Sequence, residues 1–254
     1  MPFCKFASLR NGMNLIIDVG NSFVKLAVFE KDKMLIRHKV QSKDVLKTLR
    51  LLRKEYKNLQ KAIISSVGKL RQTDVAYVEK YFETIVLNSE TKLPFENLYS
   101  TPKTLGIDRI ALVSASVEQF PDKNVLIIDA GTCITFDFIT KENHYLGGAI
   151  SPGIRMRYKA LHNFTANLPL LETEIPKNSI GNSTANSMHS GVVQGVLLEI
   201  EGAIQKYKLK YPDLTVILTG GDTNFLSKQL KSSIFANSNF LLEGLNYLLQ
   251  FNTH

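Results

Sequence analysis

The sequence predicts an α/β protein made of two related halves, each a mixed sheet with helices on its faces. Short apolar runs that end in glycine turns alternate with helical patterns along the chain. Residues 15–35 (LIIDVGNSFVKLAVFEKDKML) also align without gaps on residues 126–146 (LIIDAGTCITFDFITKENHYL), at a shift of 111 positions. A second echo pairs residues 63–69 with 217–223 in the same order, so duplication explains the pattern better than chance.

The first half is expected to begin with a strand at 15–18, which ends in the turn Gly20, Asn21, Ser22. Two further strands form a hairpin around a polar turn at 30–33, and Ser42 is expected to cap a helix that runs to about Tyr56. The expected elements, in order, are strands at 15–18, 23–29 and 34–40, a helix at 42–56, a strand at 62–67, a helix at 75–82, a strand at 85–87, an irregular stretch at 88–103 and an apolar helix at 107–117.

The second half repeats this order. Three strands are expected at 125–129, 134–139 and 145–150, then helices at 154–164 and 185–206, a buried strand at 215–219, and helices near Ser227 and at 241–249. The expected domains are therefore a first half over 13–119 and a second half over 120–254, after an N-terminal extension at 1–12.

Composition narrows the class of protein. No apolar run approaches the roughly 20 residues of a membrane span, and residues 1–12 lack the apolar core of a secretory signal. Cys4 and Cys133 lie 129 positions apart, which favours neither a disulfide nor a zinc site and fits a reducing, cytoplasmic location. The net charge of +8 indicates either an anionic partner or the solvated face of a basic helix within 43–61.

Two carboxylates, Asp18 and Asp129, stand where an apolar strand meets a glycine turn. If the two halves face each other, two carboxylates and two sets of turn N–H groups would surround a phosphate and its cation. The alternative is that each aspartate caps its own turn. Lys25 either reaches a phosphate as a point charge or is an outward lysine, and Asn21, Ser22 and Thr132 suit phosphate oxygens or cation-bound water.

Asp108 follows Gly106 in the first turn of an expected helix. It is either a general base for a hydroxyl nucleophile, with Arg109 binding an anionic substrate group, or an ordinary helix-start charge. The glycines of residues 147–153 (GGAISPG) allow a close backbone approach to a ligand, and those of 219–222 (TGGD) end the last strand.

Together these motifs resemble the type III pantothenate kinases, which belong to the superfamily of sugar kinases, actin and heat-shock chaperone ATPases. The resemblance runs from Met13 almost to the C-terminus and rests on DVGNSFVK (18–25), YSTPKTLGIDR (99–109), DAGTCIT (129–135), GGAISPG (147–153), GNSTANSMHSG (181–191) and TGGD (219–222). It implies duplicated ribonuclease H-like (actin-like ATPase) domains and the ATP-dependent phosphorylation of pantothenate to 4'-phosphopantothenate, the first step of coenzyme A biosynthesis.

The resemblance also implies roles for individual residues, with ATP and Mg²⁺ as cofactors and a homodimer as the assembly. Asp108 is the implied catalytic proton acceptor, and Asp129 the implied ligand of a monovalent cation, K⁺ or NH₄⁺. The implied ATP-binding residues are Asp18, Val19, Gly20, Asn21, Ser22, Phe23, Val24, Lys25 and Thr132. The implied pantothenate-binding residues are Tyr99, Gly106, Ile107, Asp108, Arg109 and Thr184. Ser22 stands where the family usually has Thr, and Cys133 where Ala is usual.

Three other functions stay open on the sequence. A nucleic-acid-associated transcriptional accessory factor of the same fold would fit the basic charge, although no helix-turn-helix signature or interleaved arginine and aromatic surface is visible. A catalytically idle nucleotide-binding scaffold is disfavoured because Asp108 and Asp129 are both present. A related kinase with a different alcohol substrate is separated from a pantothenate kinase by the resemblance of 99–109 alone.

Overall fold

The structure is a computed structural model that describes residues 12–20, 22–66 and 70–253, and the chain divides into two compact units. Unit 1 comprises the chain up to Pro94, residues 103–115 and residues 242–254; unit 2 comprises residues 95–102 and 116–241. This division differs from the expected halves, because the last helix joins unit 1 and a short segment before residue 103 joins unit 2. Of the expected N-terminal extension, residues 1–11 lie outside the described part.

Unit 1 is built on a five-stranded sheet with strand order β3-β2-β1-β4-β5. β1 pairs antiparallel with β2 and parallel with β4, so the sheet is mixed, as expected. The strands are β1 (Met13–Val19), β2 (Val24–Glu30), β3 (Lys33–Val40), β4 (Leu59–Ser66) and β5 (Glu83–Val86).

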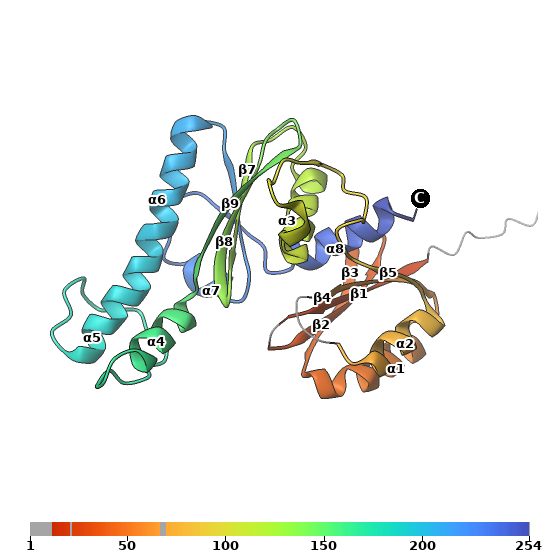
Figure 1. Cartoon of the computed structure of the whole chain (residues 1–254), viewed down its shortest axis with the longest axis horizontal. Coiled ribbons are helices and arrows are strands. Elements are labelled where there is room, and N and C mark those ends of the chain that lie inside the picture. The colour runs from red at the N-terminus through yellow and green to blue at the C-terminus, as the bar shows by residue number, and fades with distance from the viewer. Residues whose placement is uncertain (1–11, 21, 67–69, 254) are drawn as a thin grey trace, which may run out of the picture. The chain divides into compact units, whose positions relative to one another are not determined.

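Two helices, α1 (Val45–Glu55) and α2 (Gln72–Tyr81), lie on one face of this sheet (Figure 1). The apolar stripe of α1, at Val45, Leu49 and Leu52, is fully buried against alternate residues of β1 such as Leu15 and Ile17. The other residues of β1, including Asp18, therefore point to the opposite face.

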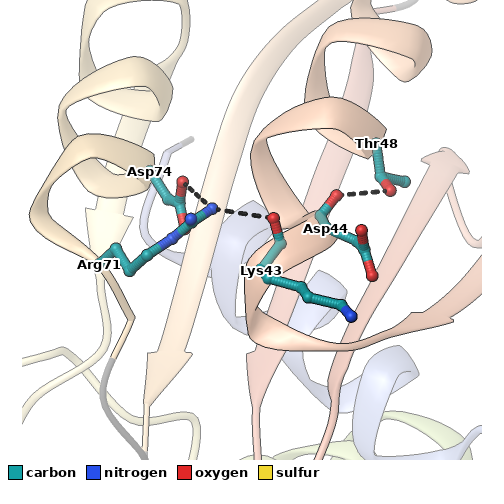
Figure 2. Close-up of polar contacts among 5 residues, drawn as sticks. All are labelled: Lys43, Asp44, Thr48, Arg71 and Asp74. Carbon is teal, nitrogen blue, oxygen red and sulfur yellow. Dashed lines mark hydrogen bonds and ion pairs between the residues drawn. The ribbon is translucent and has the colours of Figure 1, made fainter.

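The starts of α1 and α2 are joined by one arginine (Figure 2). Arg71 forms a bidentate ion pair with buried Asp74, at 2.9 and 3.0 Å, and donates to the carbonyl of Lys43 at 3.3 Å. The expected cap at Ser42 is wrong: residues Ser42–Asp44 form a 3₁₀ turn, and α1 begins at Val45 without a side-chain cap. Thr48 instead donates to the carbonyl of Asp44 at 3.0 Å, within the first turn.

The opposite face of the unit 1 sheet contacts α8 (Phe240–Phe251), the last helix of the chain. The amide of Asn14 on β1 donates to Asn246 on α8 at 2.8 Å, and both side chains are buried. Gly244 lets α8 approach α3 (Ile107–Gln119) closely, since a Cβ there would lie 1.9 Å from the carbonyl oxygen of Ala111. These contacts place the N-terminal part of α3, with Asp108, in unit 1.

Unit 2 is built on a six-stranded sheet with strand order β11-β10-β7-β8-β9-β6. Its strands are β6 (Glu96–Asn97), β7 (Val125–Ala130), β8 (Cys133–Ile139), β9 (His144–Pro152), β10 (Thr215–Thr219) and β11 (Phe235–Ala236). One face packs on α4 (Ile154–Asn163), α5 (Thr184–His189), α6 (Gly195–Lys210) and α7 (Thr223–Leu226). The expected helix at 185–206 is interrupted by a π-helical turn at Ser190–Gln194.

The two sheets share one topology, which supports the expected duplication. The order β3-β2-β1-β4-β5 reappears as β9-β8-β7-β10-β11, and β6 adds a strand beyond β9. The second echo has the right register, because Ile16 pairs with Ile63 as Ile127 pairs with Ile217. Even the irregularity between Val28 and Phe29 recurs between Phe138 and Ile139.

The gapless alignment of the first echo is wrong by one residue after the turn. Asp18 pairs with Lys25, whereas Asp129 pairs with Thr135 rather than Phe136. The second turn is one residue shorter than the first, so the equivalent of Lys25 is Thr135. Within the described part of the chain, no helix combines the length and apolar character that a membrane crossing requires.

Candidate active site

In unit 1 the strand–turn motif forms a partly buried ion pair. Asp18 is the last but one residue of β1, and its side chain is buried, because the strand is central in the sheet. Lys25, directly opposite on β2, donates from Nζ to Asp18 Oδ2 at 3.1 Å, while 37% of its own side chain is exposed. The ammonium group can therefore reach solvent, or a ligand, without unfolding the strand.

The loop between β1 and β2 is closed by one backbone bond. The Gly20 N–H donates to the Phe23 carbonyl at 3.1 Å, and Ser22 and Phe23 are exposed at its tip. The Phe23 ring lies 4.2 Å below the ammonium of Lys39. Asn21, one of the expected phosphate-binding residues, lies outside the described residues.

Asp108 lies close enough to Asp18 for the two charges to interact. Burial raises the pKa of the Asp18 carboxyl, the ion pair with Lys25 opposes that rise, and the charge of Asp108 adds to it. The structure thus brings Asp18, Lys25 and Asp108 together within unit 1.

Two neighbouring residues position the Asp108 carboxylate at the start of α3. Its Oδ1 accepts the N–H of Arg109 at 2.9 Å, and it leans over Gly106, where a Cβ would lie 2.4 Å from the same oxygen. Any side chain at residue 106 would push the carboxylate aside. Arg109 is itself buried, with 5% of its surface exposed, so it is not an ordinary surface helix-start residue.

In unit 2 the second turn begins at Gly131, and Gly153 packs against it. Gly131 N–H donates to the Cys133 carbonyl at 2.9 Å, and Thr132 is exposed at the tip. Gly153 donates to the Thr132 carbonyl at 3.1 Å, and a Cβ on it would lie 2.1 Å from the Gly131 oxygen. The sequence predicted that the glycines of 147–153 let the backbone approach a ligand closely. At Gly153 the backbone instead lies close to the turn at 131–132.

Asp129 is the last but one residue of β7, as Asp18 is of β1, and it is half-buried. Gly220, with φ of +97°, packs on it so closely that a Cβ would lie 2.3 Å from Asp129 Oδ1. The backbone N–H of Asp222 donates to the Ala130 carbonyl at 2.9 Å, which attaches the loop after β10 to the end of β7. The TGGD motif thus positions the Asp129 carboxylate.

Tyr99, also in unit 2, is held by Tyr145, which the sequence did not single out, and by Gly147. Its ring stacks on that of buried Tyr145, with centroids 6.1 Å apart and planes at 24°. The Tyr145 hydroxyl donates to Asp137 at 2.7 Å. Gly147 has φ of +100°, and a Cβ on it would lie 3.1 Å from the Tyr99 ring. The glycine pair at 147–148 was the one signal in the sequence for this contact, because glycine adopts a positive φ readily.

Thr184, the remaining expected substrate contact, is exposed at the first residue of α5. The preceding Ser183 caps that helix, accepting the N–H of Asn186 at 3.2 Å. Thr184, Thr132 and Tyr99 all belong to unit 2, and the first two are exposed.

The basic surface of α1 bears on the alternative of nucleic-acid binding. Lys43, Lys47, Arg50, Lys54 and Arg71, with Leu46 and Leu51, line a shallow groove of about 470 Å³. An arginine and tyrosine surface that the sequence did not show is present beside it, since Arg53 lies 3.6 Å over the ring of Tyr81. Because that arginine covers a face of the ring, the tyrosine is less available for base stacking.

Comparison with known proteins identifies the relatives of the chain. The family model described as type III pantothenate kinase matches residues 14–206. A type III pantothenate kinase of Christiangramia forsetii is 51% identical over 240 residues, which cover 94% of this chain and 99% of that protein. Among solved structures, a Baf family protein of Campylobacter jejuni superposes with a TM-score of 0.60 at 24% identity, covering 94% of this chain and 98% of that one. Glucokinase from an Antarctic psychrotroph superposes with a TM-score of 0.52 at 11% identity, covering 94% and 99%, which indicates a shared fold.

Proposed function

The chain belongs to the type III pantothenate kinase family, and from that premise we propose a role for each residue of the site. The activity is that of a phosphotransferase with an alcohol acceptor: ATP phosphorylates pantothenate to 4'-phosphopantothenate in coenzyme A biosynthesis. The fold is the duplicated mixed α/β fold shared with sugar kinases. The observation that carries the assignment of roles is the grouping of Asp18, Lys25 and Asp108 in unit 1.

We assign the phosphates of ATP to the two strand–turn motifs. In unit 1 Lys25 would exchange its bond to Asp18 for a phosphate oxygen, which its partly exposed side chain permits. In unit 2 Thr132 is exposed at the tip of the turn, where its hydroxyl would bind a phosphate oxygen. The proposed ATP-binding residues are Asp18, Val19, Gly20, Asn21, Ser22, Phe23, Val24, Lys25 and Thr132.

The divalent cation fits the oxygen donors of unit 1. No group of three or more His, Cys, Asp or Glu side chains that could hold a metal occurs among the described residues. Mg²⁺ commonly takes one or two carboxylates and completes its shell with phosphates and water, so Asp18 suffices as its protein ligand. When bound, the ion would neutralise charge on the transferring phosphoryl group.

We propose that Asp108 is the general base for the acceptor hydroxyl. Its carboxylate is half-buried, is oriented by the Arg109 N–H and has Gly106 beneath it. A primary alcohol needs proton removal only late in the transfer, so a base of ordinary strength suffices. Pantothenate would contact Tyr99, Gly106, Ile107, Asp108, Arg109 and Thr184, and buried Arg109 could pair with its carboxylate.

Three finer features complete the proposal. Asp129, held by Gly220, would bind K⁺ or NH₄⁺. We also propose a homodimer, with Leu198 of α6, of which 72% is exposed, as a candidate contact. A cytoplasmic location is supported by the free thiol of Cys133.

A coupled assay of ADP formation tests the function. With ATP and Mg²⁺ the rate should depend on pantothenate and saturate with it. Glycerol and glucose, as other alcohols, serve as controls and should give no more than the background rate. ADP formation that is independent of pantothenate would refute the function and favour an ATPase or an idle scaffold.

A further inference from the structure

Ser65 is a buried residue beside Asp18 that the proposed mechanism does not yet use. It lies on β4 and pairs in parallel register with Asp18 on β1. Residues paired in this way project to the same face of a sheet, so the two side chains are neighbours. Ser65 is 1% exposed, and its Oγ has no hydrogen-bond partner among the residues that the structure describes.

An unpartnered hydroxyl in a sheet interior is unfavourable, because the group has lost water and gained nothing in return. Alanine at this position would fill nearly the same space without that cost. A serine that destabilises the fold is typical of a residue that serves the site rather than the core.

The second half repeats the arrangement independently. Thr219 on β10 pairs in register with Asp129 on β7, and it too is buried, with 2% exposed. Each half therefore places a hydroxyl residue next to the carboxylate that ends its central strand, although the adjacent buried positions, such as Ile64 and Leu218, are aliphatic.

Asp18 needs a second donor when Lys25 turns away. In the structure Lys25 donates to Asp18 Oδ2 at 3.1 Å. If the ammonium moves to a phosphate, a buried carboxylate next to the charge of Asp108 loses that bond. A serine side chain can rotate about its Cα–Cβ bond, which moves Oγ, so Ser65 can become the replacement donor without moving its backbone.

We propose that Ser65 is a positioning residue for phosphoryl transfer: its hydroxyl donates a hydrogen bond to the Asp18 carboxylate when Lys25 binds the ATP phosphates. This inference rests on the proposed roles of Asp18 and Lys25. Ser65 touches neither substrate nor phosphate; it acts by keeping the Asp18 carboxylate oriented while that carboxylate serves the nucleotide and its cation.

The test compares three variants. Ser65→Ala removes the hydroxyl, and Ser65→Thr keeps a hydroxyl and copies Thr219 of the second half. Ser114→Ala is the control. Ser114 is equally buried in unit 1, but its hydroxyl already donates to the Ile110 carbonyl at 2.9 Å. Each variant is assayed for kcat, for KM with ATP and with pantothenate, and for its thermal midpoint.

Ser65→Ala should lower kcat roughly tenfold or more, as the loss of a bond to a charged group would, while the KM for pantothenate stays within about twofold. Its thermal midpoint should equal or exceed that of the wild type. Ser65→Thr should recover most of kcat, and Ser114→Ala should keep full kcat with a lower midpoint.

The inference alone is overturned by Ser65→Ala with wild-type kcat, or by Ser65→Ala with kcat and thermal midpoint both reduced, as for a purely structural residue. The same holds if Ser65→Ala does not fold, since that makes the serine structural. A wild-type protein without pantothenate-dependent turnover would instead refute the proposed function, and the inference with it.

Discussion

Replacing Asp108 by asparagine separates a general base from a helix-start charge. The substitution keeps the size of the side chain and an oxygen that can accept the Arg109 N–H, now at 2.9 Å from Oδ1. It removes the proton acceptor and the negative charge that acts on Asp18. The fold should therefore tolerate the change, whereas the proposed chemistry should not.

The expected magnitudes follow from these contacts. Loss of a general base costs about 10²–10⁴ in kcat, which is about 2.7–5.4 kcal/mol of barrier at 1.36 kcal/mol per tenfold. Loss of a charge in the first turn of a helix costs only about 0.3–1 kcal/mol of stability, and relief of the repulsion with Asp18 offsets part of it. The thermal midpoint should fall by no more than about 4 °C.

The assay is ADP formation under saturating ATP and pantothenate, together with thermal unfolding of the same preparations. Asp44→Asn is the matched control, because Asp44 also stands at a helix start and makes no side-chain cap. Asp44→Asn should retain kcat. An Asp108→Asn protein that turns over at more than a tenth of the wild-type rate would refute the base, and a midpoint lowered by much more than that of Asp44→Asn would show a structural role.

Three further predictions concern ions, assembly and pH. Replacing K⁺ and NH₄⁺ by tetramethylammonium should reduce kcat severely if Asp129 binds a monovalent ion. Full activity in the bulky cation would refute that role of Asp129. Sedimentation at micromolar concentration should give about twice the 28.5 kDa of one chain, and a monomer mass would count against the dimer. Burial raises the pKa of Asp222, so its ionisation destabilises the fold as pH rises through that raised pKa. Asp222→Asn should thus raise the thermal midpoint at neutral pH and lose this advantage below about pH 3.8, the ordinary pKa; an equal midpoint at neutral pH would contradict this.

The sequence predicted the central strands because their signal is local. The runs at 15–17 and 126–128 are continuous and apolar, and all of their residues are fully buried in their sheets. The pairing of Asp18 with Lys25 could be inferred from a hairpin, but not the shorter second turn that makes Thr135 its counterpart. Identical letters on both sides of a turn conceal a one-residue difference in loop length.

What the sequence could not supply depends on contacts between distant residues. The last helix joins unit 1 through Asn14 and Asn246, 232 positions apart, which no local pattern reveals. The two-residue strands at Glu96–Asn97 and Phe235–Ala236 are too short for any periodicity. The buried Ser65 beside Asp18 also escapes detection, because a serine in a strand has no distinctive spacing.

The most direct test of phosphoryl transfer to pantothenate is a ³¹P NMR spectrum of the products. Wild-type protein with ATP, Mg²⁺, K⁺ and pantothenate should produce a phosphomonoester signal that grows in step with ADP. Its chemical shift should coincide with that of authentic 4'-phosphopantothenate. Inorganic phosphate in place of that signal, or no consumption of ATP at all, would contradict the account.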